Sequence, residues 1–218
     1  MTTFVLVHGA WHGGWAWERV VPLLPNAVAP DLTHDRDVGL DDHVDELLSV
    51  VDSVDDPDLV LVGHSYAGLV VRQAADRRPD RVAHVVLVEG WAARSGVSLI
   101  DLAPFLAGIL AAADGWRVPA PAPAAYGVTD PEDVAWLSSR LCDQPLRTFT
   151  EPTTLTGAVD RIPGTAVHCR PEVRPFARLG KELGYRSVAI DGAHDIMLTD
   201  PRGVAEALWP LRNEKCLL

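Results

Sequence analysis

A serine stands where an apolar run turns into a helical pattern. The segment LVLVGHSYAGLVV (59–71) begins with β-type residues, passes through a Gly-rich turn and continues as an apolar helical run. A sharp strand-to-helix turn lifts the Ser65 hydroxyl above the sheet, and the residues two positions away on either side must be small. Gly63 and Ala67 meet this requirement. Ser65 is therefore the candidate nucleophile, and the Tyr66 N–H, at the helix N-terminus, is a candidate donor to an oxyanion.

A second Gly-rich loop follows the first apolar run of the chain. It reads HGAWHGGWAW (8–17), and the backbone N–H of Ala10 is expected to complete a two-donor oxyanion hole with Tyr66. His8 and His12 have the i, i+4 spacing of a zinc pair. The glycine between them and the missing glutamate argue against such a site, so no metal is expected.

The candidate general base is His194. It lies in IDGAHDIMLTDP (190–201), after the last predicted strand and before a helix that opens with proline. A histidine on such a loop can reach over the nucleophile. His64 is expected to pack behind the nucleophile. The remaining histidines are interpreted as structural or solvated: His34, His43, His84 and His168.

The acid that would orient His194 has more than one candidate. In a Ser–acid–His order, a carboxylate follows the strand that precedes the histidine strand. That strand is TAVHC (165–169), and the loop after it, RPEV, contains Glu172. Glu172 is the preferred candidate. Glu89, at the end of VVLVE, is the main competitor, and Asp195 or the absence of a functional acid are further alternatives.

Strand-type and helical patterns alternate around these residues. This alternation predicts an α/β protein with a mostly parallel sheet, helices on both faces and strands buried on both sides. The predicted strands are 3–8, 26–32, 58–65, 82–90, 164–169 and 186–194. The predicted helices are 40–54, the run after Gly68, the stretch from Val173 to Leu183, and 201–211.

Residues 91–155 interrupt the alternation. The stretch has no clear strand, contains the Pro/Ala-rich VPAPAPAAYG (118–127), and is interpreted as a helical cap or lid inserted at one edge of the sheet. A plain long crossover is the alternative. Residues 1–90 and 156–218 would then form the core. An apolar pocket wall is expected from Trp11, Trp91, Leu102, Phe105, Leu106, Trp116, Tyr126 and Trp136.

Composition excludes several kinds of partner and compartment. Nineteen basic and thirty acidic residues give a net charge of −11, with no Lys/Arg run, so neither nucleic acid nor an anionic membrane is expected to bind. Three widely spaced cysteines are interpreted as free thiols, and no secretory segment is visible at the N-terminus, which together predict a cytoplasmic protein. The longest apolar stretch, 102–113, is too short to span a bilayer.

With these motifs assembled, the chain resembles the α/β-hydrolase superfamily. It is most similar to the small-esterase and hydroxynitrile-lyase group, which includes plant methyl-ester esterases. The resemblance rests on the HGAWHGGW loop, GHSYAG (63–68) and GAHDIMLTDP (192–201). It implies the α/β-hydrolase fold with a small, mainly helical cap, Ser65 as nucleophile, His194 as base, and the Ala10 and Tyr66 amides as the oxyanion hole. The family's acid, an Asp three residues after a Cys, corresponds to Glu172, and the short chain implies a trimmed cap.

The resemblance favours ester hydrolysis over cyanohydrin cleavage. Lyases of this group carry Thr at the position of Gly9 and Lys at that of Asp195, and neither is present. No dinucleotide or Walker A motif appears, so no cofactor is expected. The hypothesis is a serine hydrolase acting on a small ester-like molecule through an acyl-enzyme. A lyase or rearrangement enzyme and an inactive ligand-binding protein are the alternatives, and the oligomeric state stays open, a homodimer included.

Overall fold

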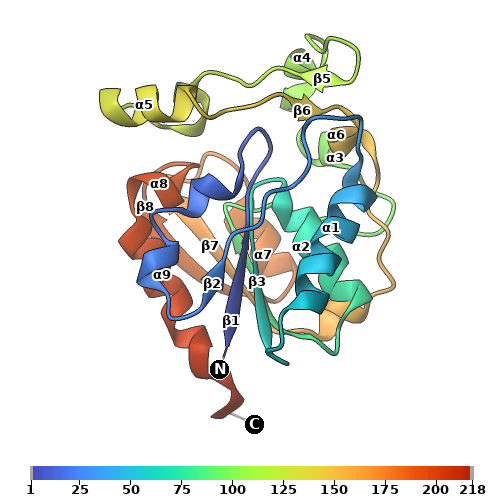
Figure 1. Cartoon of the computed structure of the whole chain (residues 1–218), viewed down its shortest axis with the longest axis vertical. Helices are drawn as coiled ribbons and strands as arrows, with labels where there is room; N and C mark the ends of the chain where they lie inside the picture. Colours follow the sequence, from blue (N-terminus) through green and yellow to red (C-terminus); the bar gives the residue numbers. More distant parts are fainter. Residues whose placement is uncertain (1, 217–218) are drawn as a thin grey trace.

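A six-stranded parallel sheet forms the centre of the protein in the computed structural model, which describes residues 2–216 and the side chains of residues 2–212 (Figure 1). Its strand order is β2-β1-β3-β4-β7-β8, with all neighbouring pairs parallel. The predicted fold class is thereby confirmed. The strands are β1 (Thr3–Val7), β2 (Ala27–Val28), β3 (Leu59–His64), β4 (Val82–Val88), β7 (Gly164–Arg170) and β8 (Arg186–Asp191).

Burial separates the central strands from the edges of the sheet. Every residue of β3 is buried, as expected for a strand covered on both faces. The prediction fails at the edges. Strand β8 has only exposed and half-buried residues, because it has a neighbour on one side only. The predicted strand 26–32 shortens to two residues because Pro30 has no N–H to donate to a ladder.

Helices cover both faces of the sheet. Figure 1 shows α1 and α2 on one side and α8 and α9 on the other, while α7 packs on β7 and β8. Helix α7 begins only at Phe176, so Val173 is not helical and is 84% exposed, contrary to prediction. Pro175 disfavours helical backbone at the residue before it, which delays the start. The helices are α1 (Leu40–Ser53), α2 (Ala67–Arg77), α7 (Phe176–Glu182), α8 (Ile196–Thr199) and α9 (Pro201–Leu208).

The segment between β4 and β7 lies over the carboxyl ends of the strands (Figure 1). Contrary to prediction it contains strands, since β5 and β6 form an antiparallel pair. Part of the Pro/Ala-rich stretch is a 3-10 turn, Pro123–Tyr126, rather than extended chain. The other elements are α3 (Leu99–Leu102), α4 (Ala107–Leu110), β5 (Arg117–Val118), α5 (Pro131–Ser138), β6 (Gln144–Pro145) and α6 (Arg147–Thr150).

Trp11 joins this segment to the loop after β1. Its backbone N–H donates to Gln144 Oε1 at 2.8 Å, and its indole Nε1–H donates to the Val118 carbonyl at 3.0 Å. Its own carbonyl accepts from the Cys142 N–H at 3.1 Å. The overlying segment is therefore tied by hydrogen bonds directly to the loop that carries Ala10.

Within residues 2–216, no helix is both long enough and apolar enough to cross a bilayer. Cys142 and Cys169 are free thiols, and the side chain of Cys216 lies outside the described residues.

Candidate active site

Ser65 occupies the sharp turn between β3 and α2. Its φ is 53°, a left-handed conformation that non-glycine residues seldom adopt. A Cβ at Gly63 would lie 2.5 Å from the Ala67 carbonyl oxygen, and a Cβ at Gly68 would collide with the Trp91 backbone. After the serine, the position with no room for a side chain is therefore Gly68. This explains why alanine is tolerated at position 67.

His194 lies over Ser65, as the sequence predicted. Its Nε2 is 2.9 Å from Ser65 Oγ, and the residue is only 8% exposed. The imidazole stacks on the Phe176 ring, with 10° between the planes and 5.7 Å between the centroids. His64 donates from Nε2 to the His194 carbonyl at 3.0 Å. Packing on one side and a hydrogen bond to the backbone hold the histidine in place.

Glu89 is the carboxylate that meets His194. It follows β4 directly, is 5% exposed, and has a φ of 47°. Its Oε2 lies 3.2 Å from His194 Nδ1, and its Oε1 accepts the Cys169 N–H at 2.7 Å. Both oxygens are engaged, so the carboxylate has a defined orientation. A carboxylate at Nδ1 keeps that nitrogen protonated and leaves Nε2 free to take a proton from the serine.

The preference for Glu172 as this acid is wrong for this structure. Glu172 is exposed and accepts the backbone N–H of Ala177 at 3.0 Å, in the first turn of α7. The Glu172 carboxylate is therefore engaged by that helix and not by His194. The competing candidate, Glu89, occupies the position beside the histidine, while Asp195 contacts His12 instead.

The two residues that were predicted to supply the oxyanion hole lie beside Ser65 in the cavity lining. Ala10 and Tyr66 both line the cavity, and neither N–H donates to an acceptor within the described residues. The Tyr66 hydroxyl lies 3.0 Å from His43 Nδ1, and His43 Nε2 donates to the Thr33 carbonyl at 2.8 Å. Since Nε2 carries the proton, the Tyr66 hydroxyl donates to Nδ1, which ties the side chain to α1.

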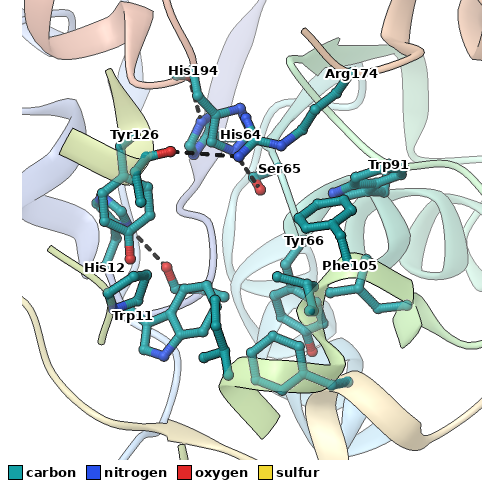
Figure 2. Close-up of a pocket in the computed structure, with 17 residues that line it drawn as sticks. Trp11, His12, His64, Ser65, Tyr66, Trp91, Phe105, Tyr126, Arg174 and His194 are labelled. Carbon is teal, nitrogen blue, oxygen red and sulfur yellow. Dashed lines mark hydrogen bonds between the residues drawn. The ribbon is translucent and has the colours of Figure 1, made fainter. Parts of the chain in front are cut away.

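A cavity of about 190 Å³ opens at Ser65. Its lining is mainly apolar and aromatic (Figure 2). Of the residues predicted to form its wall, Trp11, Trp91, Phe105, Leu106 and Tyr126 line it. The lining residues that sequence reasoning did not assign to it are His12, His64, Leu99, Ile109, Pro121, Ala125, Phe149 and Arg174.

Three predicted wall residues lie elsewhere. Trp136 packs edge-on against Trp15, with 5.3 Å between the centroids, and takes the Arg140 guanidinium on its face. Trp116 is covered by the Arg117 guanidinium, and Leu102 does not line the cavity. Spacing along the chain did not show which side of these short segments faces inwards.

Burial and neighbouring charges set the protonation of the site. Burial lowers the pKa of His194; the hydrogen bond to Glu89 opposes this shift, and the nearby Arg174 charge adds to it. Burial also lowers the pKa of His64, to about 3. Both imidazoles are therefore neutral at neutral pH, and His194 is ready to accept a proton.

A second buried pair lies beside the first. His12 Nε2 is 3.0 Å from Asp195 Oδ2, and the two side chains are 1% and 0% exposed. Burial alone would lower the pKa of His12, but the Asp195 carboxylate raises it above the usual value. Burial would raise the pKa of Asp195, but His12 and the other histidines lower it. The pair is an ion pair, and it leaves no net charge on this side of the cavity.

His8 and His12 do not share a site. His8 Nε2 accepts the Leu32 N–H at 3.0 Å, whereas His12 is bonded to Asp195. Among the side chains of residues 2–212, no three from His, Cys, Asp or Glu gather closely enough to hold a metal ion.

The chain is similar to known proteins in sequence and in fold. A model of the alpha/beta hydrolase family matches residues 4–207. The carbendazim hydrolyzing esterase of Nocardioides sp. (strain SG-4G) is 32% identical over 249 aligned positions, covering 97% of this chain and 100% of that protein. Methylesterase 2 of Arabidopsis thaliana is 37% identical over 102 positions, covering 40% of this chain and 39% of its own.

The same fold occurs in solved structures. An extracellular alpha/beta-hydrolase from a Paenibacillus species, described as sharing homology with tobacco salicylic acid binding protein 2, has a TM-score of 0.85. It is 20% identical and covers 96% of this chain and 98% of its own. The fold and the site define an esterase-type hydrolase, an enzyme of the carboxylic ester hydrolase class. The chain belongs to the alpha/beta hydrolase family.

Proposed function

We propose that the protein hydrolyses small carboxylic esters through an acyl-enzyme on Ser65. The observation that carries this proposal is the uninterrupted chain from Glu89 through His194 to Ser65, with contacts of 3.2 and 2.9 Å, at the floor of an apolar cavity. A nucleophile, a base within hydrogen-bond reach and an acid that orients the base are what acyl transfer to serine requires.

In the first half-reaction, His194 Nε2 takes the Ser65 proton while Oγ forms a bond to the ester carbonyl carbon. The carbonyl oxygen becomes an oxyanion, which accepts hydrogen bonds from the Ala10 and Tyr66 amides in this proposal; both residues line the cavity. Glu89 stabilises the imidazolium that forms. His194 then gives its proton to the alkoxy oxygen, the carbon–oxygen bond breaks, and the alcohol leaves.

In the second half-reaction, water replaces the alcohol. His194 removes a proton from the water, whose oxygen attacks the acyl carbon, and the same amides hold the second oxyanion. The proton returns to Ser65 Oγ as the ester bond to the enzyme breaks and the carboxylic acid departs. Every proton transfer thus runs through one nitrogen, Nε2, which lies within hydrogen-bond distance of the serine oxygen.

The cavity favours a small substrate. We propose that residues 91–155 act as the cap, because Trp91, Phe105 and Tyr126 from this range close the space above Ser65. The Tyr126 hydroxyl is buried and has no hydrogen-bond partner among the described residues. The names of the Nocardioides esterase and of the Arabidopsis methylesterase agree with an ester as substrate.

The site gives little support to a lyase reaction of the hydroxynitrile-lyase type. A Cβ at Gly9 would lie 2.7 Å from His64 Nδ1 and 3.1 Å from Ser65 Cβ, so the threonine of those lyases does not fit here without displacing His64. Position 195, where they carry lysine, does not line the cavity, and Asp195 turns to His12. Solved structures of tomato methylketone synthase I, at 17% identity, share the fold alone.

The test is intact-mass analysis after incubation with a fluorophosphonate, followed by peptide mapping and turnover of a panel of short-chain esters. The expected result is one adduct, on Ser65, none in Ser65→Ala, and turnover of at least one ester. Labelling without turnover of any ester would favour another reaction on the same scaffold. Absence of labelling on folded protein would instead favour a ligand-binding protein.

A further inference from the structure

Arg174 is a cationic side chain of the cavity and has no counterion among the described residues. It stands on the loop between β7 and α7, lines the cavity and is half-buried. Figure 2 shows it reaching towards His194 from the side of Trp91 and Phe105, opposite Trp11. Its hydrogen bond within the described residues is a long one, from an Nη atom to the Ala125 carbonyl at 3.5 Å.

The nearby carboxylates are already engaged by other donors. The Glu89 oxygens accept from the Cys169 N–H and face His194 Nδ1. Asp195 is held by His12. Neither carboxylate, nor any other within the described residues, forms an ion pair with Arg174. Burial lowers the pKa of its guanidinium, and the more distant Glu89 and Asp195 charges oppose that shift without cancelling it.

The guanidinium also contacts an aromatic ring. It lies over the face of Phe105, with 5.6 Å from Cζ to the ring centroid. An aromatic face tolerates a cation but leaves its N–H groups unbonded. A guanidinium has five donors in a planar fork that matches a carboxylate with two parallel hydrogen bonds. The guanidinium is half-buried and has one long hydrogen bond, so its donors are available to an anionic ligand that enters the cavity.

We propose that Arg174 is a substrate-binding residue and that the preferred substrates are small esters that also carry a carboxylate. This inference rests on the proposed esterase function and deepens it by naming the substrate class. His12, the other cation on the lining, is already neutralised by Asp195, so the open positive charge is at Arg174. The carboxylate of the substrate would take both Arg174 donors while its ester carbonyl faces the Ala10 and Tyr66 amides.

The experiment compares anionic esters with neutral esters of the same shape. Monomethyl succinate against methyl 4-oxopentanoate places the carboxylate on the acyl half. Acetoxyacetate against acetoxyacetone places it on the alcohol half. The readout is the ratio of kcat/KM for the anionic ester to that for its neutral partner, within one variant. A ratio cancels any general effect of a substitution on the chemistry of Ser65 and His194.

Three variants complete the design. Arg174→Met removes the charge and keeps an unbranched apolar stem; Arg174→Lys keeps the charge and loses the fork. Arg178→Met is the matched control, because Arg178 lies on α7 with its side chain 70% exposed and paired with Glu182. In at least one ester pair, Arg174→Met should lower the ratio by about 10- to 100-fold, with Arg174→Lys in between. Arg178→Met should keep the wild-type ratio.

The inference is overturned if the ratios of Arg174→Met stay within about twofold of wild type for both pairs. A failure of the proposed function has a different signature, in which Ser65 is not labelled and no ester of either kind turns over. In that case, titration calorimetry of Ser65→Ala with acetoxyacetate decides the inference. Binding that is lost in Ser65→Ala/Arg174→Met supports it, and binding that is equal in both proteins, or absent from both, overturns it.

Discussion

Ser65 and Glu89 occupy matching positions on two neighbouring parallel strands, each one residue beyond the end of its strand. His64 at the end of β3 pairs with Val88 at the end of β4, and the next residues have φ values of 53° and 47°. The Ser65 N–H donates to the Val88 carbonyl at 3.2 Å. The register of β3 and β4 thus places the nucleophile and the acid next to each other. His194, on the loop after β8, contacts both.

Glu89→Gln should reduce kcat by about 10²- to 10⁴-fold, because an amide neither enforces the Nδ1–H tautomer nor stabilises the imidazolium. Glu172→Gln is the matched control. Its amide oxygen can still accept the Ala177 N–H, so kcat should stay at the wild-type value. Steady-state kinetics with one neutral ester checks both. Loss of activity in Glu172→Gln together with a fully active Glu89→Gln would reverse the assignment.

The acid limb of the pH profile should lie below pH 6.5, the ordinary histidine value, because burial lowers the pKa of His194 and only the neutral imidazole accepts the Ser65 proton. Arg174 adds to that lowering. Arg174→Met should therefore raise the pKa of His194 and move the midpoint of kcat/KM to higher pH. The profile is measured with a neutral ester, so that the substrate does not titrate. An unchanged or lower midpoint in Arg174→Met would contradict the prediction, and Arg178→Met should leave the midpoint in place.

Asp195→Asn should destabilise the fold most at mildly acidic pH. Because the pKa of His12 is raised, its contribution to the free energy of unfolding is complete below pH 6.5, the ordinary histidine value. This contribution is lost as the pH rises through the folded-state pKa of His12. Because the pKa of Asp195 is lowered, its contribution to the free energy of unfolding is present above pH 3.8, the ordinary aspartate value. This contribution is lost as the pH falls through the folded-state pKa of Asp195.

Breaking a buried ion pair costs about 3–5 kcal/mol, so the free energy of unfolding of Asp195→Asn should fall by that amount near about pH 6 and by less near about pH 9. Urea unfolding at both pH values measures it. Asp191→Asn is the control: its side chain is 80% exposed and pairs with Arg170, so little change is expected. An equal loss at both pH values would argue against an ion pair between His12 and Asp195.

Gly9→Ala should impair both folding and catalysis. The added Cβ would lie 2.7 Å from His64 Nδ1, and His64 holds the His194 carbonyl, so the strain reaches the base directly. Overpacking of this kind costs about 1–3 kcal/mol, and a displaced base lowers kcat by about tenfold or more. Thermal unfolding and ester kinetics check the two effects.

Gly108→Ala is the control for that substitution. Position 108 lies in α4 and has open space around it, so alanine there should leave kcat unchanged and raise stability by about 0.5–1 kcal/mol. If Gly9→Ala and Gly108→Ala had the same kcat and the same stability, the crowding at Gly9 would not matter for folding or catalysis.

The sequence alone determined the fold class and the position of the serine. Both follow from local patterns, because Ser65 stands in one continuous segment of the sequence. This segment consists of a buried apolar strand, a tight turn with Gly63 and an apolar helix. His194 was predictable for a related reason, since it directly follows the last strand of a parallel sheet and the ends of such strands share one edge.

Only the tertiary structure decided which acid and which cavity residues lie beside Ser65 and His194. Glu89 and His194 are 105 positions apart, and their contact depends on the register of three strands, whereas Glu172 bonds to the first turn of α7. That same loop delivers Arg174 to the cavity, two residues after the glutamate expected there. Side-chain direction in the short cap elements likewise places Phe149 inside and Trp136 outside. These outcomes depend on packing between segments far apart in the chain, which no local pattern encodes.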